Sequence, residues 1–266
     1  GAANLPVIVD LATDFTRLPL NHPDAALLGV EDALVKRAYY ASLQLASGVC
    51  VSNESFAEVL RQSSLPVDVI PDGWNQFDIM WSRPLLNSMF FNLGLNLIPG
   101  QIDDVIPLRR AVTRLIREFP HTRLVISGDL DVYQMFDNLP DARKLFLPPM
   151  ELADYPYLLA RMDLLMVSLK ESEFNRLRSD RLLLEAGARR IPWVAAPVPA
   201  YVEWGSGGLI AASSEEWYIH LQTLIQDAEL RHKLGQSGYQ KALQRDLQSL
   251  SKLWARLMQK PVENKI

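Results

Sequence analysis

The chain has 266 residues, of which 48% are hydrophobic and 22% charged, a composition typical of a globular protein with a sizeable core. Its formal net charge of −4 provides no global basic surface, so the sequence predicts no nucleic-acid partner. The single cysteine, Cys50, excludes an internal disulfide framework and a zinc site built from cysteines. No apolar run has the length needed to span a bilayer. We expect a cytoplasmic protein, with peripheral attachment at the inner membrane face as the alternative.

In the first part of the chain, short apolar runs alternate with helical patterns, which indicates parallel α/β architecture. Asn53 or Ser55 is expected to cap a helix, residues 71–75 have turn chemistry, and residues 76–88 are expected to form a linker. We therefore predict a partial N-terminal domain over residues 1–75. Its expected strands are 6–10, 48–52 and 67–70, and its longest expected helix is 31–46.

A second and more complete unit is expected over residues 89–245, because strand and helix patterns continue there without interruption. In an open parallel sheet of this kind, ligands bind beyond the carboxyl ends of the strands. The expected strands are 90–97, 123–127, 144–147, 163–168, 192–196 and 208–211. The expected helices are 103–119, 156–162, 179–188, one capped by Ser213, and a helical region at 227–260.

The segment 174–201 carries the strongest functional pattern in the chain. Asn175, Arg178 and Ser179 lie in a loop just before a helix, and Glu185 lies in the second half of that helix. Cationic and hydroxyl groups at a helix N-terminus suit a phosphate, because free N–H groups and the helix dipole point there. A carboxylate about two turns further on can accept bonds from hydroxyls of the same ligand. The alternative is an ordinary amphipathic helix with a solvated arginine and glutamate.

This segment resembles the donor-site segment of the GT-B glycosyltransferases, in the retaining group often called family four. Weaker similarities follow in the family's order over almost the whole chain, at 49–52, 70–73 and 154–163. Arg178 replaces the family lysine, while Leu177 and Leu182 stand where the family often has charged residues. The matching residues are Phe174, Asn175, Ser179, Leu184, Glu185 and the turn 198–201.

The resemblance implies an α/β, GT-B-like fold with two Rossmann-like units and parallel sheets, the second complete and the acceptor-side first one reduced. It also implies that the C-terminal helix, 246–266, packs back on the N-terminal part. The short first domain indicates either a fragment of a longer protein or a naturally reduced domain, so a further domain of the same protein is one expected partner.

The resemblance also assigns roles within the site. Arg178 and Ser179 would hold the diphosphate, Glu185 would bind the ribose hydroxyls, and Pro149 and Met150 would line the base. Asn175 belongs to the same nucleotide-sugar-binding set, together with the glycines Gly100 and Gly128 at two strand ends. At Gly100, a plain turn is as good an interpretation as a close approach to phosphate.

No catalytic residue, cofactor or metal ligand is assigned from the sequence. The run 128–131, Gly-Asp-Leu-Asp, has a metal-like spacing, but it lies where a strand turns into a helix, which favours capping. His22 is the histidine considered for contact with substrate, although it lies in an ordinary-looking loop. Asp10, Thr13 and Asp14 resemble an acidic turn of the family and would face an acceptor hydroxyl or cap a turn.

The sequence therefore predicts a glycosyltransferase, hexosyltransferase-like and of the kind used in polysaccharide biosynthesis. It would move a sugar from a nucleotide-diphosphate donor, with retention of configuration, to a glycan, lipid-linked or protein acceptor. The alternative is a non-catalytic GT-B-like binding or scaffold module, favoured by Leu177 and Leu182. A non-hydrolysing epimerase of the same fold has no visible support in the histidines.

Overall fold

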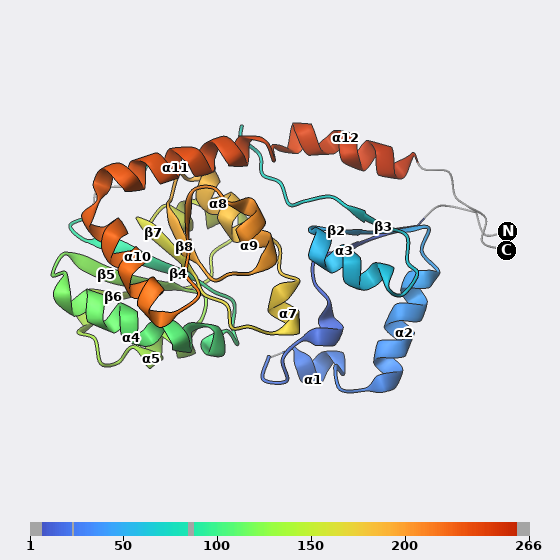
Figure 1. Cartoon of the computed structure of the whole chain (residues 1–266), viewed down its shortest axis with the longest axis horizontal. Helices are drawn as coiled ribbons and strands as arrows, with labels where there is room; N and C mark the ends of the chain where they lie inside the picture. Colours follow the sequence, from blue (N-terminus) through green and yellow to red (C-terminus); the bar gives the residue numbers. More distant parts are fainter. Residues whose placement is uncertain (1–6, 23, 85–87, 260–266) are drawn as a thin grey trace.

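The computed structural model describes residues 7–22, 24–84 and 88–259, and it contains two parallel β-sheets (Figure 1). Within these residues the smaller sheet has three strands and the larger has six. The predicted α/β class with two parallel sheets is confirmed. Within the same residues, no helix combines the length and the apolar character that crossing a membrane requires.

The smaller sheet has the strand order β1-β2-β3. Asn53 caps α3 by accepting a hydrogen bond from the Phe56 N–H at 3.0 Å, which confirms the predicted cap. Phe56 and Leu60 of α3 are buried against Val49 and Val51 of the central strand, so this face of the helix builds the core. The elements are β1 (Ile8–Leu11), η1 (Phe15–Arg17), α1 (Ala25–Leu28), α2 (Ala33–Gln44), β2 (Gly48–Val51), α3 (Glu54–Arg61) and β3 (Val67–Val69).

The larger sheet has the order β6-β5-β4-β7-β8-β9, with every neighbouring pair parallel. The chain enters at the centre, winds outward to β6, and then returns to the other side of β4. The point between β4 and β7 is therefore the topological switch at which α/β folds bind ligands. The strands are β4 (Phe91–Asn96), β5 (Thr122–Ser127), β6 (Lys144–Leu147), β7 (Leu164–Val167), β8 (Trp193–Ala195) and β9 (Gly208–Ile210).

Helices cover both faces of this sheet (Figure 1). Leu108, Val112 and Leu115 form the buried stripe of α4, as their helical spacing predicts. The helices are η2 (Ile79–Trp81), α4 (Ile102–Glu118), α5 (Leu130–Met135), η3 (Asp141–Arg143), η4 (Leu152–Asp154), α6 (Tyr155–Leu159), α7 (Glu173–Arg176), α8 (Arg181–Ala188), α9 (Pro199–Trp204), α10 (Ser214–Gln226), α11 (Ala228–Leu243) and α12 (Leu247–Met258).

Two predicted elements differ from the structure. The turn expected at 198–201 runs into α9, because Pro199 fixes a backbone angle suited to the start of a helix. The helical region expected at 227–260 is two helices, α11 and α12. Asp246 has extended backbone and caps α12, while the backbone of Trp74 bonds with Arg245 and Leu247 across the break.

The helix α12 returns to the smaller sheet, beside which it lies in Figure 1. Leu257 of α12 packs with Cys50 and Ile70, and the partly buried Trp254 contacts the same cluster. Burial raises the pKa of the Cys50 thiol to about 11, in keeping with a structural role for this residue. The chain thus crosses between the two sheets twice, through the segment after β3 and through the break before α12.

Candidate functional site

The loop from β4 to α4 is held by Asp129, which follows β5. The N–H groups of Gly100 and Gln101 donate to Oδ2 of Asp129 at 3.1 and 3.3 Å. Oδ1 accepts from the N–H groups of Asp131 and Val132, so the expectation that this turn caps a helix is confirmed. Among the residues that the structure describes, no group of three or more His, Cys, Asp or Glu side chains is placed to hold a metal ion.

Two predicted glycines shape this edge of the sheet. Gly100 and Gly128 have φ angles of +90° and +88°, which residues other than glycine rarely adopt. A Cβ on Gly128 would lie 1.9 Å from the carbonyl oxygen of Leu97, so this glycine lets the β5 end pass close to the β4–α4 loop. Pro149 and the exposed Met150 follow β6, two strands away from β4, and lie outside the cavity at the switch point.

Asp104, in the first turn of α4, ties the loop after β7 to this edge. Its Oδ1 accepts from the Lys170 N–H at 2.9 Å and from Nδ2 of Asn175 at 2.8 Å. Its Oδ2 accepts from Nε2 of Gln101 at 3.3 Å, and its carbonyl oxygen accepts from the Ser168 hydroxyl. Asp104 is buried, so these bonds are shielded from water. Asn175 therefore braces the loop through its amide group.

A cavity of about 110 Å³ lies at the switch point, between the loops that follow β4 and β7. Gly100 and Asp104 line one side, and Lys170, Asn175 and Arg178 line another. The Arg178 guanidinium lies 5.8 Å from the centre of the Phe174 ring, and Lys170 Nζ lies 3.7 Å from a carboxylate oxygen of Asp103. Two cationic residues and a glycine turn therefore line the same cavity.

Ser179 and Asp180 precede α8 beside this cavity but do not line it. The side chain of Asp180 makes no cap bond with α8, and instead accepts from a guanidinium N–H of Arg245 at 3.0 Å. The first N–H groups of α8 therefore have no side-chain cap, which is the condition under which a helix N-terminus binds an anion.

Glu185 is buried within α8, outside the cavity lining, and both of its carboxylate oxygens are engaged. Oε1 accepts from Arg181 at 2.8 Å, and Oε2 accepts from the Tyr155 hydroxyl at 2.7 Å. Tyr155 in turn accepts from Nδ2 of Asn96, the last residue of β4. Burial raises the pKa of Glu185, while the bonds from Arg181 and Tyr155 act against that shift. This hydrogen-bonded chain ends at the same sheet edge as Gly100.

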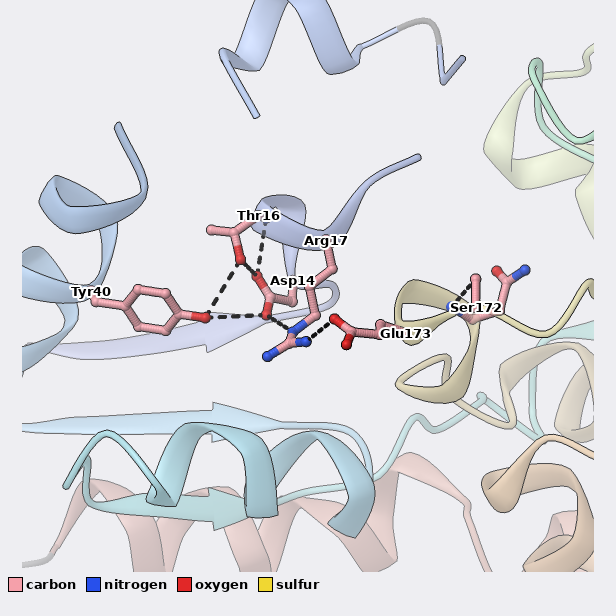
Figure 2. Close-up of polar contacts among 7 residues, drawn as sticks. Asp14, Thr16, Arg17, Tyr40, Ser172 and Glu173 are labelled. Atoms are coloured by element: carbon pink, nitrogen blue, oxygen red, sulfur yellow. Dashed lines mark hydrogen bonds and ion pairs between the residues drawn. The ribbon is translucent and has the colours of Figure 1, made fainter. Parts of the chain in front are cut away.

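The N-terminal unit, built on the smaller sheet β1–β3 with its helices, contacts the segment of α7 beside this site through η1 (Figure 2). Asp14 caps η1 and accepts from the Thr16 N–H and hydroxyl and from Arg17 Nε. Asp14, in the acidic turn after β1, therefore caps a turn, which is one of the two roles expected for it. Arg17 also forms an ion pair with Glu173 at the start of α7, so a single arginine links the two units. His22, from the following loop, lines the cavity and accepts from the Asp24 N–H through Nδ1.

Removing Arg17 should cost more stability than removing Glu173. Asp14 has a fully buried carboxylate, so Arg17→Ala leaves it without its cation and should lower the free energy of unfolding by about 2 kcal/mol. Glu173 has a side chain 78% exposed, so Glu173→Ala should cost less than about 1 kcal/mol. Urea unfolding of both variants measures the difference. Equal costs would show that the bond to Asp14 contributes little.

Apolar contacts also dock α7 onto the N-terminal unit. Phe174 is buried with Leu18, Ala25 and Val30. Leu177 is buried in the cluster that surrounds Val51, and its carbonyl oxygen accepts from Nδ2 of Asn53 at 2.9 Å. The leucine at a position where the family has an acidic residue therefore packs into the neighbouring unit.

Sequence reasoning missed three residues of this site. Asp104 was read only as part of a helix, because its partners lie 66 and 71 residues further along the chain. Lys170 was also missed, since a single lysine carries no pattern. Arg181 gave a usable signal, because it stands four residues before Glu185 and such pairs meet on a helix.

The fold matches those of solved glycosyltransferases. The HepE protein of Anabaena, in complex with UDP and glucose, gives a TM-score of 0.71 at 20% identity over 96% of this chain and 72% of its own. A glycosyltransferase from Rickettsia africae gives 0.70 at 12% identity, over 97% and 71%. S. aureus TarM, in complex with fondaparinux, alpha-GlcNAc-glycerol and UDP, gives 0.69 at 13% identity, over 85% and 47%.

No protein-family model matches the sequence, and no curated protein matches it. The likeness therefore lies in the fold of the chain and not in its sequence. The two parallel sheets of the chain, together with the matches at TM-scores near 0.7, place it in the GT-B fold class, the fold of the glycosyltransferases that it matches.

Proposed function

We propose that the chain binds a nucleotide-diphosphate sugar at the ends of β4 and β7 and transfers its sugar, with retention, to a glycan or other acceptor. The observation that carries this proposal is the meeting of Arg178, Lys170 and the Gly100 turn in one cavity at the switch point. Among the structural matches, HepE is in complex with UDP and with UDP-glucose, and TarM is in complex with a glycan and UDP. These matches support a nucleotide-sugar donor and a glycan acceptor.

In this proposal Arg178 and the uncapped N-terminus of α8 bind the diphosphate, since a guanidinium fork and helix N–H groups both suit phosphate oxygens. Glu185 binds the ribose, whose hydroxyls must then replace the bonds from Arg181 or Tyr155 that this carboxylate now accepts. The bond from the anomeric carbon to the diphosphate breaks as the acceptor oxygen forms its new bond. The diphosphate leaves with the electron pair, and the acceptor proton passes to it. Charge neutralisation by arginine and N–H groups then requires no metal.

Domain opening is part of the proposal. A cavity of about 110 Å³ is smaller than the roughly 300 Å³ or more that ligand sites usually have. The loop with Asn21 and His22 covers the site, and Asn21 donates to Asp103 at 3.1 Å across the gap. We therefore infer that the nucleotide enters when the N-terminal unit moves away from α7, and that the described structure is a closed form.

Arg178→Ala should weaken binding of one nucleoside diphosphate by about 30-fold, because a charge-assisted bond to phosphate contributes about 2 kcal/mol. Calorimetric titration with UDP, GDP and ADP, in magnesium and in EDTA, measures this and names the base. Arg176→Ala is the matched control, because Arg176 is exposed on α7 and lies outside the cavity lining. No binding of any of the three by the folded wild type would contradict the donor site.

The scaffold alternative has one specific observation in its favour. Leu177, at a position where the family has an acidic residue, is buried against the N-terminal unit and offers no charge to a sugar. A scaffold would bind nucleotide, or nothing, without turning it over. Release of UDP from UDP-glucose in the presence of a mixture of glycan acceptors separates the two: the transferase releases UDP in proportion to enzyme, whereas the scaffold releases none.

A further inference from the structure

A cluster of arginines lies at the amino-terminal edge of the larger sheet, at the opposite ends of the strands from the donor cavity. Most of its members stand near the start of a strand: Arg123 in β5, Arg161 before β7, and Arg189 and Arg190 before β8. Arg83 joins them from the segment that connects the two units. Ligands of α/β folds bind at the carboxyl ends of the strands, so the donor site gives these cations no role.

The half-buried Tyr157 of α6 is at the centre of this arginine cluster. The guanidinium carbons of Arg83 and Arg161 lie 5.1 and 5.7 Å from the centre of its ring. Arg189 donates to the carbonyl oxygens of Met80 and Arg83 at 2.9 and 2.8 Å, and its charge is within reach of the Tyr157 hydroxyl. Three guanidinium groups from separate parts of the chain therefore lie around one tyrosine.

Two of these guanidinium groups have free donors. Within the described part of the chain, the side chains of Arg83 and Arg161 make no hydrogen bond and no ion pair, and Tyr157 is their only printed contact. Nε of Arg161 is buried without a partner, and so is Nε of Arg189. Partly buried cations without an acceptor are costly, so an anion that brings oxygens would relieve that cost.

The guanidinium groups also repel one another. Burial lowers the pKa of Arg123, Asp163 raises it, and the charge of Arg161 lowers it again. Burial lowers the pKa of Arg189 as well, and the neighbouring Arg190 adds to that shift, with no carboxylate among the causes. Asp163 therefore balances the Arg123 end of the cluster, while the end around Tyr157 keeps an excess of positive charge.

Phosphate is the anion that suits this end of the cluster. A guanidinium fork donates two parallel bonds to the oxygens of one phosphoryl group. A phosphomonoester carries about two negative charges near pH 7 and three strong acceptor oxygens, enough for both Arg83 and Arg161. A carboxylate brings one charge and two oxygens, so it would satisfy one arginine and leave the other unbalanced.

We propose that Arg83 and Arg161, on Tyr157 and beside Arg189, form a second anion site that binds a phosphomonoester. The site lies at the edge of the sheet opposite the donor cavity and does not depend on the proposed transfer reaction. Arg83 belongs to the segment that connects the two units, whereas Arg161 belongs to the larger unit. The bound phosphate would therefore hold that segment against the larger unit.

The test follows the Nε–H signal of Arg161 by NMR, assigned with Arg161→Lys. All samples carry Arg178→Ala, so that the proposed donor site does not compete for phosphate. Glycerol 3-phosphate should shift the signal saturably, and sodium chloride at equal ionic strength should not. Arg83→Ala should weaken binding at least about tenfold, because it removes a charge-assisted pair of bonds. Arg83 is exposed and accepts from Arg189 through its backbone, so this variant keeps the bonds of Arg189.

Arg110→Ala is the matched control, because Arg110 is an exposed arginine of α4 outside the cluster. It removes the same charge and should change the affinity by less than about twofold. The inference is overturned if Arg110→Ala weakens binding as much as Arg83→Ala does, or if chloride shifts the Arg161 signal as glycerol 3-phosphate does.

Vesicles distinguish the two sources of a phosphomonoester, a soluble ligand and a lipid headgroup. Co-sedimentation with phosphatidylcholine vesicles that contain phosphatidate, but not with vesicles that contain phosphatidylserine, supports the site with a lipid as its ligand. Saturable binding of glycerol 3-phosphate without co-sedimentation supports the site with a soluble ligand. If neither glycerol 3-phosphate nor the phosphatidate vesicles bind, the arginine cluster is not a phosphate site.

Discussion

Gly128→Ala is expected to lower the free energy of unfolding by about 4 kcal/mol, the largest effect among the variants considered. The added Cβ would lie 1.9 Å from the carbonyl oxygen of Leu97, a backbone atom that cannot rotate away as a side chain can. The φ of +88° adds strain for any residue with a side chain. Both costs fall on the edge of the sheet that builds the donor cavity. Urea unfolding at equilibrium measures the change.

Gly205→Ala is the matched control for this variant. Gly205 also has a positive φ, of +60°, but its nearest atom to an added Cβ lies 3.4 Å away, so only the backbone strain remains. That strain alone should cost about 1 kcal/mol. If the two variants lose equal stability, then the close approach of β5 to the β4–α4 loop is not what requires glycine at position 128.

Asp104→Ala is expected to lower the free energy of unfolding by about 3 kcal/mol and to weaken nucleotide binding by at least about tenfold. The substitution removes the acceptor of three donors: the Lys170 N–H, the Gln101 amide and one N–H of the Asn175 amide. The Asn175 amide keeps only its bond to the Lys170 carbonyl oxygen. These donors fix the loop that carries Arg178, so the loss of position reaches the phosphate site. Urea unfolding and calorimetric titration of the same sample measure both effects.

Asp103→Ala separates this bracing role from the effect of charge. Asp103 is the adjacent carboxylate, lines the same cavity and is 44% exposed, and its side chain has polar contacts with Lys170 and Asn21 among the described residues. Removing it takes a negative charge from the phosphate site and disturbs no buried bond. Nucleotide binding should therefore become tighter and stability should change by less than about 1 kcal/mol. Weaker binding in Asp103→Ala, equal to that of Asp104→Ala, would contradict the bracing role.

The parts of the fold that were predicted from the sequence are those with local causes. The strands β7 and β8 of the larger sheet are continuous apolar runs, and β5 contains one, because both faces of a parallel sheet are buried. Such runs can be recognised without knowledge of their partners. The caps at Asn53 and Ser213 were also found, since a cap depends on residues three positions away. The break between α11 and α12 was missed because it depends on Trp74, far away along the chain.

Among the residues of the candidate site, those with a local pattern could also be predicted from the sequence, and those that depend on distant partners could not. Arg178, Asn175 and Gly100 could be named from a loop, a helix start and a turn, and the structure brings all three to one cavity. Asp104 could not be named, because its bonds to Lys170 and Asn175 join residues more than 60 positions apart. The ion pair from Arg17 to Glu173 could not be foreseen for the same reason. Leu177 was recognised as a departure from the family pattern. Its burial in the core cluster of the N-terminal unit could not be foreseen, because it depends on how the two units pack together.

A nucleoside diphosphate is expected to bind at the switch point between β4 and β7. The most direct test is a crystal structure of the chain grown with UDP at saturating concentration. We expect electron density for the diphosphate beside Gly100, with its oxygens within hydrogen-bond distance of the Arg178 guanidinium and the first N–H groups of α8. Density for UDP elsewhere on the chain, with this site holding only solvent, would contradict the claim.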